Sequence, residues 1–201
     1  MLRHLLYPLL PYRSIFYPFF VLTAITVPVW LLFRLYRGRT GARAASFPRE
    51  LLLLIFVVYL SGLAAATLEP NRNSRAQVAA TDGLELRPNL ASLTCSSASL
   101  SRGSTARSFC VRNARGNLVL FVPLGILLPL VWRRLRFWNG LLAALAISIG
   151  IELAQYLTRP WSNRLADVND VILNVLGACL GLALVSLLRL RAGERPVVAR
   201  A

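Results

Sequence analysis

Five long apolar segments constrain the fold of this chain more than any other feature of its sequence. They cover roughly residues 15–33, 51–68, 117–132, 141–157 and 171–188, contain no lysine, and have arginine only at their ends. A helix needs roughly 17–25 apolar residues to cross about 30 Å of hydrocarbon, and the segments match or approach that length. The sequence therefore predicts an all-α, polytopic membrane helix bundle with about five transmembrane helices.

Composition and charge support a membrane protein and argue against a nucleic-acid binder. The chain is 56% hydrophobic and 15% charged, whereas soluble domains average about 45–50% apolar and about 25% charged residues. The net charge is +15, and the 23 basic residues are all arginine. They cluster beside apolar segments, as topology signals and anionic-lipid contacts do, and no aromatic platform is interleaved with them.

The distribution of arginine predicts the orientation of the bundle. Residues 34–50, residues 133–140 and the C-terminal tail carry arginine clusters, and five spans place all three on one side. The positive-inside rule makes that side cytoplasmic, so we expect the N-terminus outside and the C-terminus inside. The long connection, residues 69–116, would be extracytoplasmic. It carries seven arginines, but long loops translocate largely regardless of their charge.

The long connection is a polar loop that contains two of the three cysteines. Cys95 and Cys110 can form a disulfide outside the cytosol, and two free thiols remain the alternative. Cys179 lies in an apolar segment and is expected to be a packing residue. Few large apolar residues occur in the loop, so we expect irregular structure with one short helix. The chain, residues 1–201, reads as a single domain without internal repeats.

Polar residues gather on two helix faces beside a predicted turn at 158–164. On the fourth predicted helix, a spacing of four, three and four places these on one face: Ser148, Glu152, Gln155 and Arg159. On the fifth, one face carries Asp167, Asp170, Asn174, Gly177 and Gly181. The two aspartates can cap the start of that helix. The two glycines allow another helix to approach closely, which is also consistent with a homodimer.

Glu152 lies inside an apolar helix, where an ionisable group is costly and usually faces a partner or a water-filled cavity. Arg159 and Arg164 are the candidate partners. Three readings stand open: a buried Glu–Arg clamp between helices, a polar pocket that meets a ligand, and a hydrated position near the interface.

Asn117 opens the third predicted helix at the same level. Pro123 removes a backbone donor there and is expected to kink the helix, and Gly125 eases its packing. A kinked helix beside the acidic residues could open a crevice, and ordinary packing is an equal alternative.

These residues resemble the VanZ-like family of bacterial membrane proteins. The resemblance rests on two stretches, "NLVLFVPLGILLPL" and "IELAQYLTRPWSNRLADVNDVILNVLGACLG". The matching positions are Asn117, Phe121, Pro123, Gly125, Glu152, Gln155, Arg164, Asp167, Asp170, Asn174, Gly177 and Gly181. Relatives also carry an Asn-Leu-apolar-Pro-Phe stretch before the third helix, and here "PNLASL" keeps Asn89 and Leu90 but lacks the Pro-Phe.

The resemblance implies a multi-pass protein of the bacterial cytoplasmic membrane. The founding member of that family is associated with low-level resistance to the glycopeptide teicoplanin, which acts outside the membrane on lipid-linked cell-wall precursors. The resemblance to this family implies no particular biochemical mechanism.

The first hypothesis is a non-enzymatic protein of the cell envelope whose outward polar pocket binds or protects a lipid or glycolipid. Arg159 and Arg164 would hold phosphate or pyrophosphate. The residues expected to hydrogen-bond sugar or peptide groups are Asn117, Glu152, Gln155 and Asn174. The expected partners are membrane lipids and a lipid-linked cell-wall precursor or glycopeptide, with no cofactor and no metal.

The alternative is a membrane-embedded enzyme acting on a lipid-linked phosphate or pyrophosphate. Glu152 would be the acid or base, and Asp167 with Asp170 would hold a divalent ion. The only histidine is His4, which excludes a multi-histidine zinc site in the polar region. Transport is a third reading, for which five short helices offer few polar groups.

Overall fold

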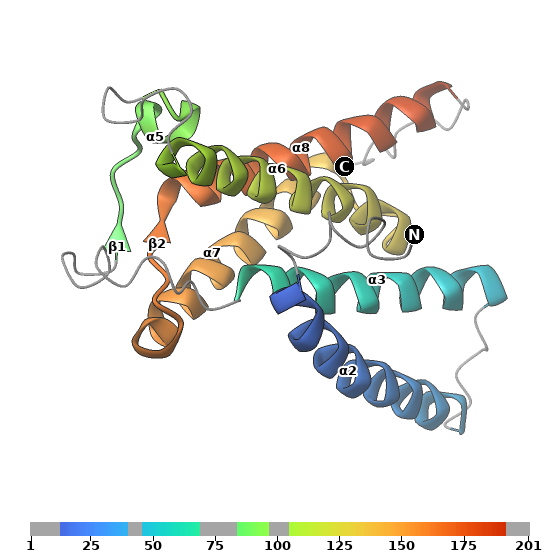
Figure 1. Cartoon of the computed structure of the whole chain (residues 1–201). Coiled ribbons are helices and arrows are strands. Elements are labelled where there is room, and N and C mark those ends of the chain that lie inside the picture. Colours follow the sequence, from blue (N-terminus) through green and yellow to red (C-terminus); the bar gives the residue numbers. More distant parts are fainter. Residues whose placement is uncertain (1–12, 40–45, 69–83, 97–104, 192–201) are drawn as a thin grey trace, which may run out of the picture. The chain divides into compact units, whose positions relative to one another are not determined.

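The computed structural model describes residues 13–39, 46–68, 84–96 and 105–191. Their elements, in chain order, are α2 (Arg13–Arg39), α3 (Phe47–Thr67), β1 (Leu84–Glu85), α5 (Leu90–Thr94), α6 (Thr105–Val131), α7 (Phe137–Ser162), β2 (Ala166–Asp167) and α8 (Val168–Arg191) (Figure 1). Five of them, α2, α3, α6, α7 and α8, are long and apolar enough to span a membrane. The predicted all-α, multi-pass membrane fold is therefore confirmed.

Each of the five long helices contains the corresponding predicted span to within one residue. Each helix also extends beyond its predicted span at one or both ends. The largest difference is at α6, which begins at Thr105, whereas the sequence predicts a loop to residue 116. No proline or glycine interrupts residues 105–115, and alanine and arginine are strong helix formers, so the helix continues outward from its apolar part. The expected short helix in the long connection is α5.

α7 also continues further than the sequence predicts. It runs through Pro160 to Ser162 and ends at Asn163, which has a left-handed conformation with φ of 50°. The Asn163 N–H donates to the Arg159 carbonyl, a common way to close a helix C-terminus. The turn therefore occupies residues 163–165, at the end of the segment expected to turn.

The chain divides into two compact units, Met1–Pro70 and Asn71–Ala201. In the first unit, α2 and α3 pack as an antiparallel hairpin. The hydroxyls of Thr26 and Ser61 are 2.8 Å apart, and Arg34 forms an ion pair with Glu50. The expectation of a single domain for residues 1–201 stays a prediction.

In the second unit, α8 packs most extensively against α6 and also contacts α7. Three glycines bring α6 and α8 together. A Cβ at Gly177 would lie 2.1 Å from the Leu118 carbonyl oxygen, and one at Gly181 would lie 2.2 Å from that of Val122. On α6, a Cβ at Gly125 would lie 2.1 Å from the Ala178 carbonyl oxygen. The two backbones are therefore in direct contact, as the spacing of Gly177 and Gly181 predicts.

The core of this unit lies along the same contact. Its buried apolar residues on α6 and α8 are Phe121, Leu124, Leu128, Val131, Ala178, Leu182 and Val185. At one end, the Arg189 guanidinium donates to the Pro129 carbonyl oxygen at 2.6 Å. The last carbonyls of a helix lack partners within the helix, so Arg189 of α8 caps the end of α6.

At the other end, β1 and β2 form a short parallel pair in which Leu84 lies opposite Ala166 and Glu85 opposite Asp167 (Figure 1). This pair joins the long connection to the segment between α7 and α8. It places the chain before α5 beside the start of α8.

Candidate functional site

Glu152 connects α7 to the segment that precedes α8. Its carboxylate Oε2 accepts a hydrogen bond from the Asp167 backbone N–H at 2.9 Å, and the residue is 8% exposed. The sequence leaves open a guanidinium clamp, a ligand pocket and a hydrated position for Glu152, and the structure shows a backbone N–H donor at its carboxylate. Arg164 is still close enough to act electrostatically on the Glu152 carboxylate.

Asp167 caps the start of α8. Its Oδ1 accepts from both the backbone N–H and the side-chain Nδ2 of Asn169, each at 2.8 Å. Burial raises the pKa of Asp167 above its ordinary value, and the two donors of Asn169 act in the opposite direction. Asn169 also accepts, through its Oδ1, the backbone N–H of Asn89 at 3.0 Å. The "PNL" stretch of the long connection is thereby tied to α8.

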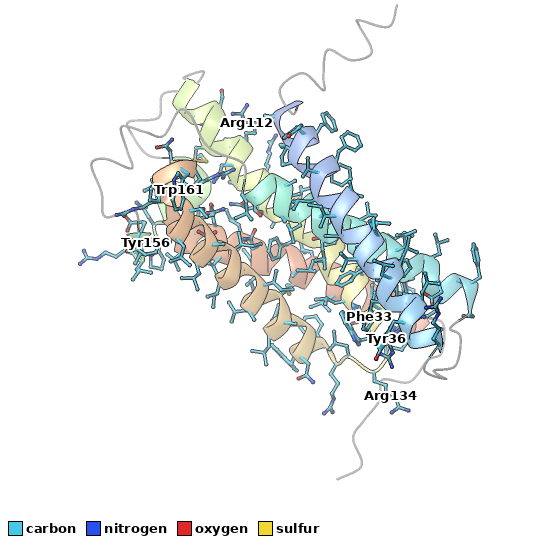
Figure 2. The ribbon with its side chains drawn as sticks, turned by 90° about the horizontal axis from the view of Figure 1, so that it is seen from below. Phe33, Tyr36, Arg112, Arg134, Tyr156 and Trp161 are labelled. Atoms are coloured by element: carbon cyan, nitrogen blue, oxygen red, sulfur yellow. A yellow bond between two sulfur atoms is a disulfide. The ribbon has the colours of Figure 1, made fainter. Side chains whose placement is uncertain are left out.

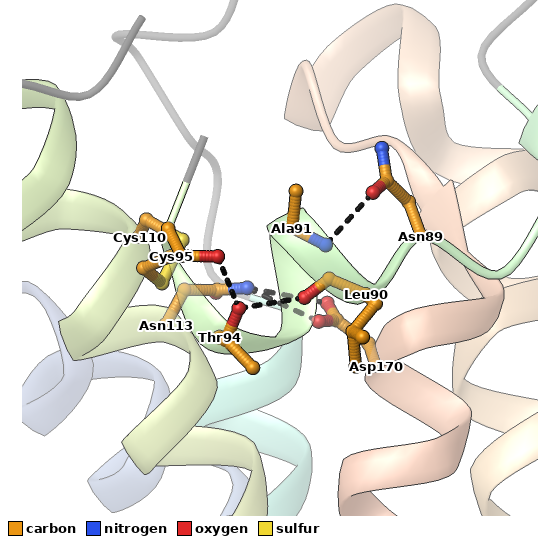
Figure 3. Close-up of a disulfide and its surroundings, with 9 residues drawn as sticks. Asn89, Leu90, Ala91, Thr94, Cys95, Cys110, Asn113 and Asp170 are labelled. Atoms are coloured by element: carbon orange, nitrogen blue, oxygen red, sulfur yellow. Dashed lines mark hydrogen bonds between the residues drawn. A yellow bond between two sulfur atoms is a disulfide. The ribbon is translucent and has the colours of Figure 1, made fainter. Parts of the chain in front are cut away.

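Asp170 connects α8 to α6. The Asn113 side-chain amide donates to both oxygens of its carboxylate, at 3.1 and 3.4 Å (Figure 3). The Asn117 amide also lies near this carboxylate. Its Nδ2 is buried, however, and makes no hydrogen bond of standard geometry to any residue that the structure describes.

A separate polar contact lies deeper between α7 and α8. The Asn174 side-chain Nδ2 donates to the Ser148 hydroxyl at 2.9 Å, and both residues are buried. Because a buried amide or hydroxyl is costly without a partner, this pair fixes how the two helices meet.

The two arginines of the predicted site have different surroundings. Arg164 acts electrostatically on Asp170 as well as on Glu152. Arg159 instead lies over the Tyr156 ring, with its guanidinium carbon 5.4 Å from the ring centroid. Gln155 is buried on α7. We use the name polar cluster for the residues that come together here: Asn113, Asn117, Glu152, Arg164, Asp167, Asn169 and Asp170.

A disulfide joins Cys95, directly after α5, to Cys110 on α6, with Cα atoms 5.9 Å apart (Figure 3). Asn113 follows Cys110 on α6 and reaches Asp170 of α8. The disulfide therefore fixes the long connection next to the polar cluster.

The sequence did not predict the roles of three asparagines in this region. They are Asn89, whose backbone N–H binds Asn169 of α8, Asn113 and Asn169 itself. Asn113 precedes Asn117 by one helical turn, a signal that the prediction of a loop up to residue 116 concealed. Asn169 lies between Asp167 and Asp170, and the prediction considered only these two acidic residues. Among the residues that the structure describes, no group of three or more histidine, cysteine or acidic side chains is arranged to hold a metal ion.

Comparison with known proteins identifies the family. The family model described as VanZ/LLP1 matches residues 51–189, which extends the resemblance from the C-terminal helices to α3 and the long connection. No curated protein and no solved structure matches the chain significantly. Because the matched region covers well over half of the sequence and includes the whole polar cluster, the chain belongs to the VanZ/LLP1 family of proteins.

Proposed function

We propose that this protein binds the polar headgroup of an envelope lipid or glycolipid at the polar cluster. The observation that carries the proposal is the Asn117 side chain, whose buried Nδ2 lies near the Asp170 carboxylate but makes no hydrogen bond of standard geometry to a described residue. Buried donors in folded proteins almost always have a partner, and an exception calls for an explanation. An oxygen of a bound headgroup would supply an acceptor of standard geometry.

The surrounding charges support a headgroup that contains phosphate. Arg164 acts electrostatically on the carboxylates of Glu152 and Asp170, and a guanidinium carries several N–H donors. Arg159 is held over Tyr156 near the C-terminus of α7. A guanidinium recognises phosphate with two parallel hydrogen bonds, so these residues suit a phosphate or pyrophosphate group.

The carboxylates favour binding over catalysis. Glu152 accepts a backbone N–H, Asp167 accepts two donors from Asn169, and Asp170 accepts the Asn113 amide. These interactions hold helices and turns together, so the carboxylates already have structural roles. A binding protein needs no additional carboxylate. An enzyme would need one of these three carboxylates to leave its hydrogen-bond donors and act on the substrate.

The proposed orientation places the polar cluster outside the cytoplasm. The disulfide at this end supports that orientation, because disulfides persist in oxidising compartments. The short arginine-rich segment 133–136 at the opposite end is the pattern expected for a cytoplasmic connection. An outward cluster would meet lipid-linked cell-wall precursors, and masking such a target would give low-level glycopeptide resistance of the teicoplanin type.

A binding titration tests the proposal. The full-length protein in lipid nanodiscs is titrated with a polyprenyl-pyrophosphate-linked disaccharide peptide, and binding is followed by the shift in thermal unfolding. We expect Asn117→Leu to weaken binding about tenfold, the equivalent of about 1.4 kcal/mol for one lost hydrogen bond. Asn139→Leu, an exposed asparagine near the start of α7, is the matched control and should bind like the wild type.

Absence of binding to the wild-type protein, or equal binding by both variants, would refute the proposal. A different result would favour the enzyme. Hydrolysis of the same probe to polyprenyl phosphate and a sugar phosphate, dependent on Mg²⁺ and abolished by Asp170→Asn, would show turnover rather than binding.

A further inference from the structure

An exposed basic face on α6 lies apart from the polar cluster. Arg112 and Arg115 are three residues apart on the helix, so they share a face, and both are exposed. Asn113, in contrast, points to Asp170 of α8. The first turns of α6 therefore present amides to the bundle and guanidinium groups away from it.

The length of α6 places this face at the level of the lipid headgroups. Arg115 and Arg112 lie roughly 24 and 28 Å along the helix from its other end at Val131, close to the ~30 Å thickness of the hydrocarbon. Two aromatic residues mark the same level on α7. Trp161 is 78% exposed and Tyr156 37% exposed, and both lie with Arg112 at the end of the unit opposite Arg134 (Figure 2). Exposed aromatic rings of this kind are typical of the membrane–water interface.

The charged side chains in the first half of α6 are all positive. The N-terminus of a helix carries a partial positive charge that acidic residues usually offset. α6 has no acidic residue in its first turn and none along its length, and it carries Arg107, Arg112 and Arg115 in its first half. Departures from a local rule are expected where a residue serves binding rather than folding.

We propose that the face formed by Arg112 and Arg115 binds the phosphate of anionic phospholipids in the leaflet at this end of the bundle. Each guanidinium offers paired donors to a phosphate, and the long side chains reach the headgroups while their stems remain in the apolar region. Trp161 and Tyr156 anchor α7 at the same depth. The surface is separate from the polar cluster, so this inference goes beyond the proposed function and can succeed or fail on its own.

Photo-crosslinking in reconstituted membranes tests the inference. The full-length protein is placed in vesicles that contain a phosphatidylglycerol or a phosphatidylcholine analogue with a diazirine next to the headgroup, and labelled peptides are mapped. We expect residues 105–116 to be labelled several-fold more by the anionic probe. The double variant Arg112→Gln/Arg115→Gln should remove this preference, and the matched variant Arg133→Gln/Arg134→Gln at the opposite end should retain it.

The preference should also fall as the salt concentration rises, because interactions between exposed charges are screened. Equal labelling by the two probes in the wild-type protein, or an unchanged preference in the Arg112→Gln/Arg115→Gln variant, would overturn the inference. Retention of the Cys95–Cys110 disulfide and a single elution peak show that each variant is folded. The lipid-pyrophosphate titration of the same variant reports separately on the polar cluster.

Discussion

At the level of single residues, Glu152 has a role that its neighbours on α7 do not share. Its carboxylate satisfies the Asp167 backbone N–H, whereas the next residue, Leu153, is 55% exposed on the outer face. A buried donor that loses its partner costs about 1–3 kcal/mol. The contribution of Glu152 to the free energy of unfolding is therefore expected to depend on its acceptor oxygen more than on its charge.

Glu152→Ala is expected to lower the free energy of unfolding by about 1–3 kcal/mol, because it leaves the Asp167 N–H without an acceptor. Glu152→Gln keeps an acceptor oxygen and should retain most of the stability. Thermal unfolding in detergent micelles measures both, with Leu153→Ala as the control for loss of side-chain volume. Equal destabilisation by Glu152→Ala and Leu153→Ala would contradict this role.

The Asp167 carboxyl is expected to make the stability of the folded protein depend on pH. Burial raises its pKa above the ordinary value of 3.8, so the folded protein holds this proton more tightly than the unfolded chain. The stability that this group contributes is full below its ordinary pKa and is lost as the pH rises through the raised value. Asp167→Asn keeps a capping oxygen without titrating.

We therefore expect the melting temperature of the wild type to fall relative to that of Asp167→Asn as the pH rises from about 3 to 7. The difference between the two curves isolates Asp167, because all other titrating groups are common to both proteins. A constant difference across this range would show that the pKa is not raised.

At the level of elements, the α6–α8 contact depends on glycine. A Cβ at Gly177 would lie 2.1 Å from a backbone oxygen of α6, which cannot move without displacing the helix. Gly177→Ala is expected to cost about 1–3 kcal/mol or more through overpacking. Gly150 of α7 has nothing within 4 Å, so Gly150→Ala should be neutral or stabilising by up to about 1 kcal/mol.

Thermal unfolding of the two variants separates close packing from helix propensity. Similar melting temperatures for Gly177→Ala and Gly150→Ala would contradict the close approach of α6 and α8 at Gly177.

The disulfide is the second feature at this level. It closes a segment with a sequence separation of 15 residues and fixes the end of α5 to α6. Closing a loop of that size stabilises a protein by about 3 kcal/mol in the chain-entropy model. The double variant Cys95→Ser/Cys110→Ser is expected to unfold correspondingly earlier, and Cys179→Ser, which removes the cysteine of α8, is the control. A melting temperature equal to that of Cys179→Ser would contradict the prediction.

At the level of the whole molecule, the proposed orientation predicts which end of the second unit faces the outside. Trp161 is 78% and Trp138 71% exposed, and they lie near opposite ends of α7. Single cysteines at these two positions, in a Cys179→Ser background that keeps the disulfide, can be probed with an impermeant thiol reagent in intact cells. We expect Trp161→Cys to be labelled and Trp138→Cys to be protected.

The reverse pattern would place the polar cluster in the cytoplasm and redirect the search to cytoplasmic ligands. Either outcome leaves the fold unchanged, because length and hydropathy define the spans without defining their direction.

The sequence by itself determined the five spans, the family and the faces on which the polar residues lie. These properties are local: an apolar run of sufficient length forms a spanning helix, and the helical repeat aligns Glu152 with Gln155 or Asp170 with Asn174. The close approach at Gly177 and Gly181 was predictable for the same reason, although the identity of the partner helix, α6, was not.

Only the tertiary structure decided what the polar groups bind. Asn113 reaches Asp170 across 57 residues of sequence, and the Asn89 N–H reaches Asn169 across 80. Glu152 meets a backbone N–H, a donor that every residue except proline possesses and that no side-chain pattern reveals. Such pairs form because buried polar groups must find partners wherever the chain brings them, and packing rather than spacing selects the partner.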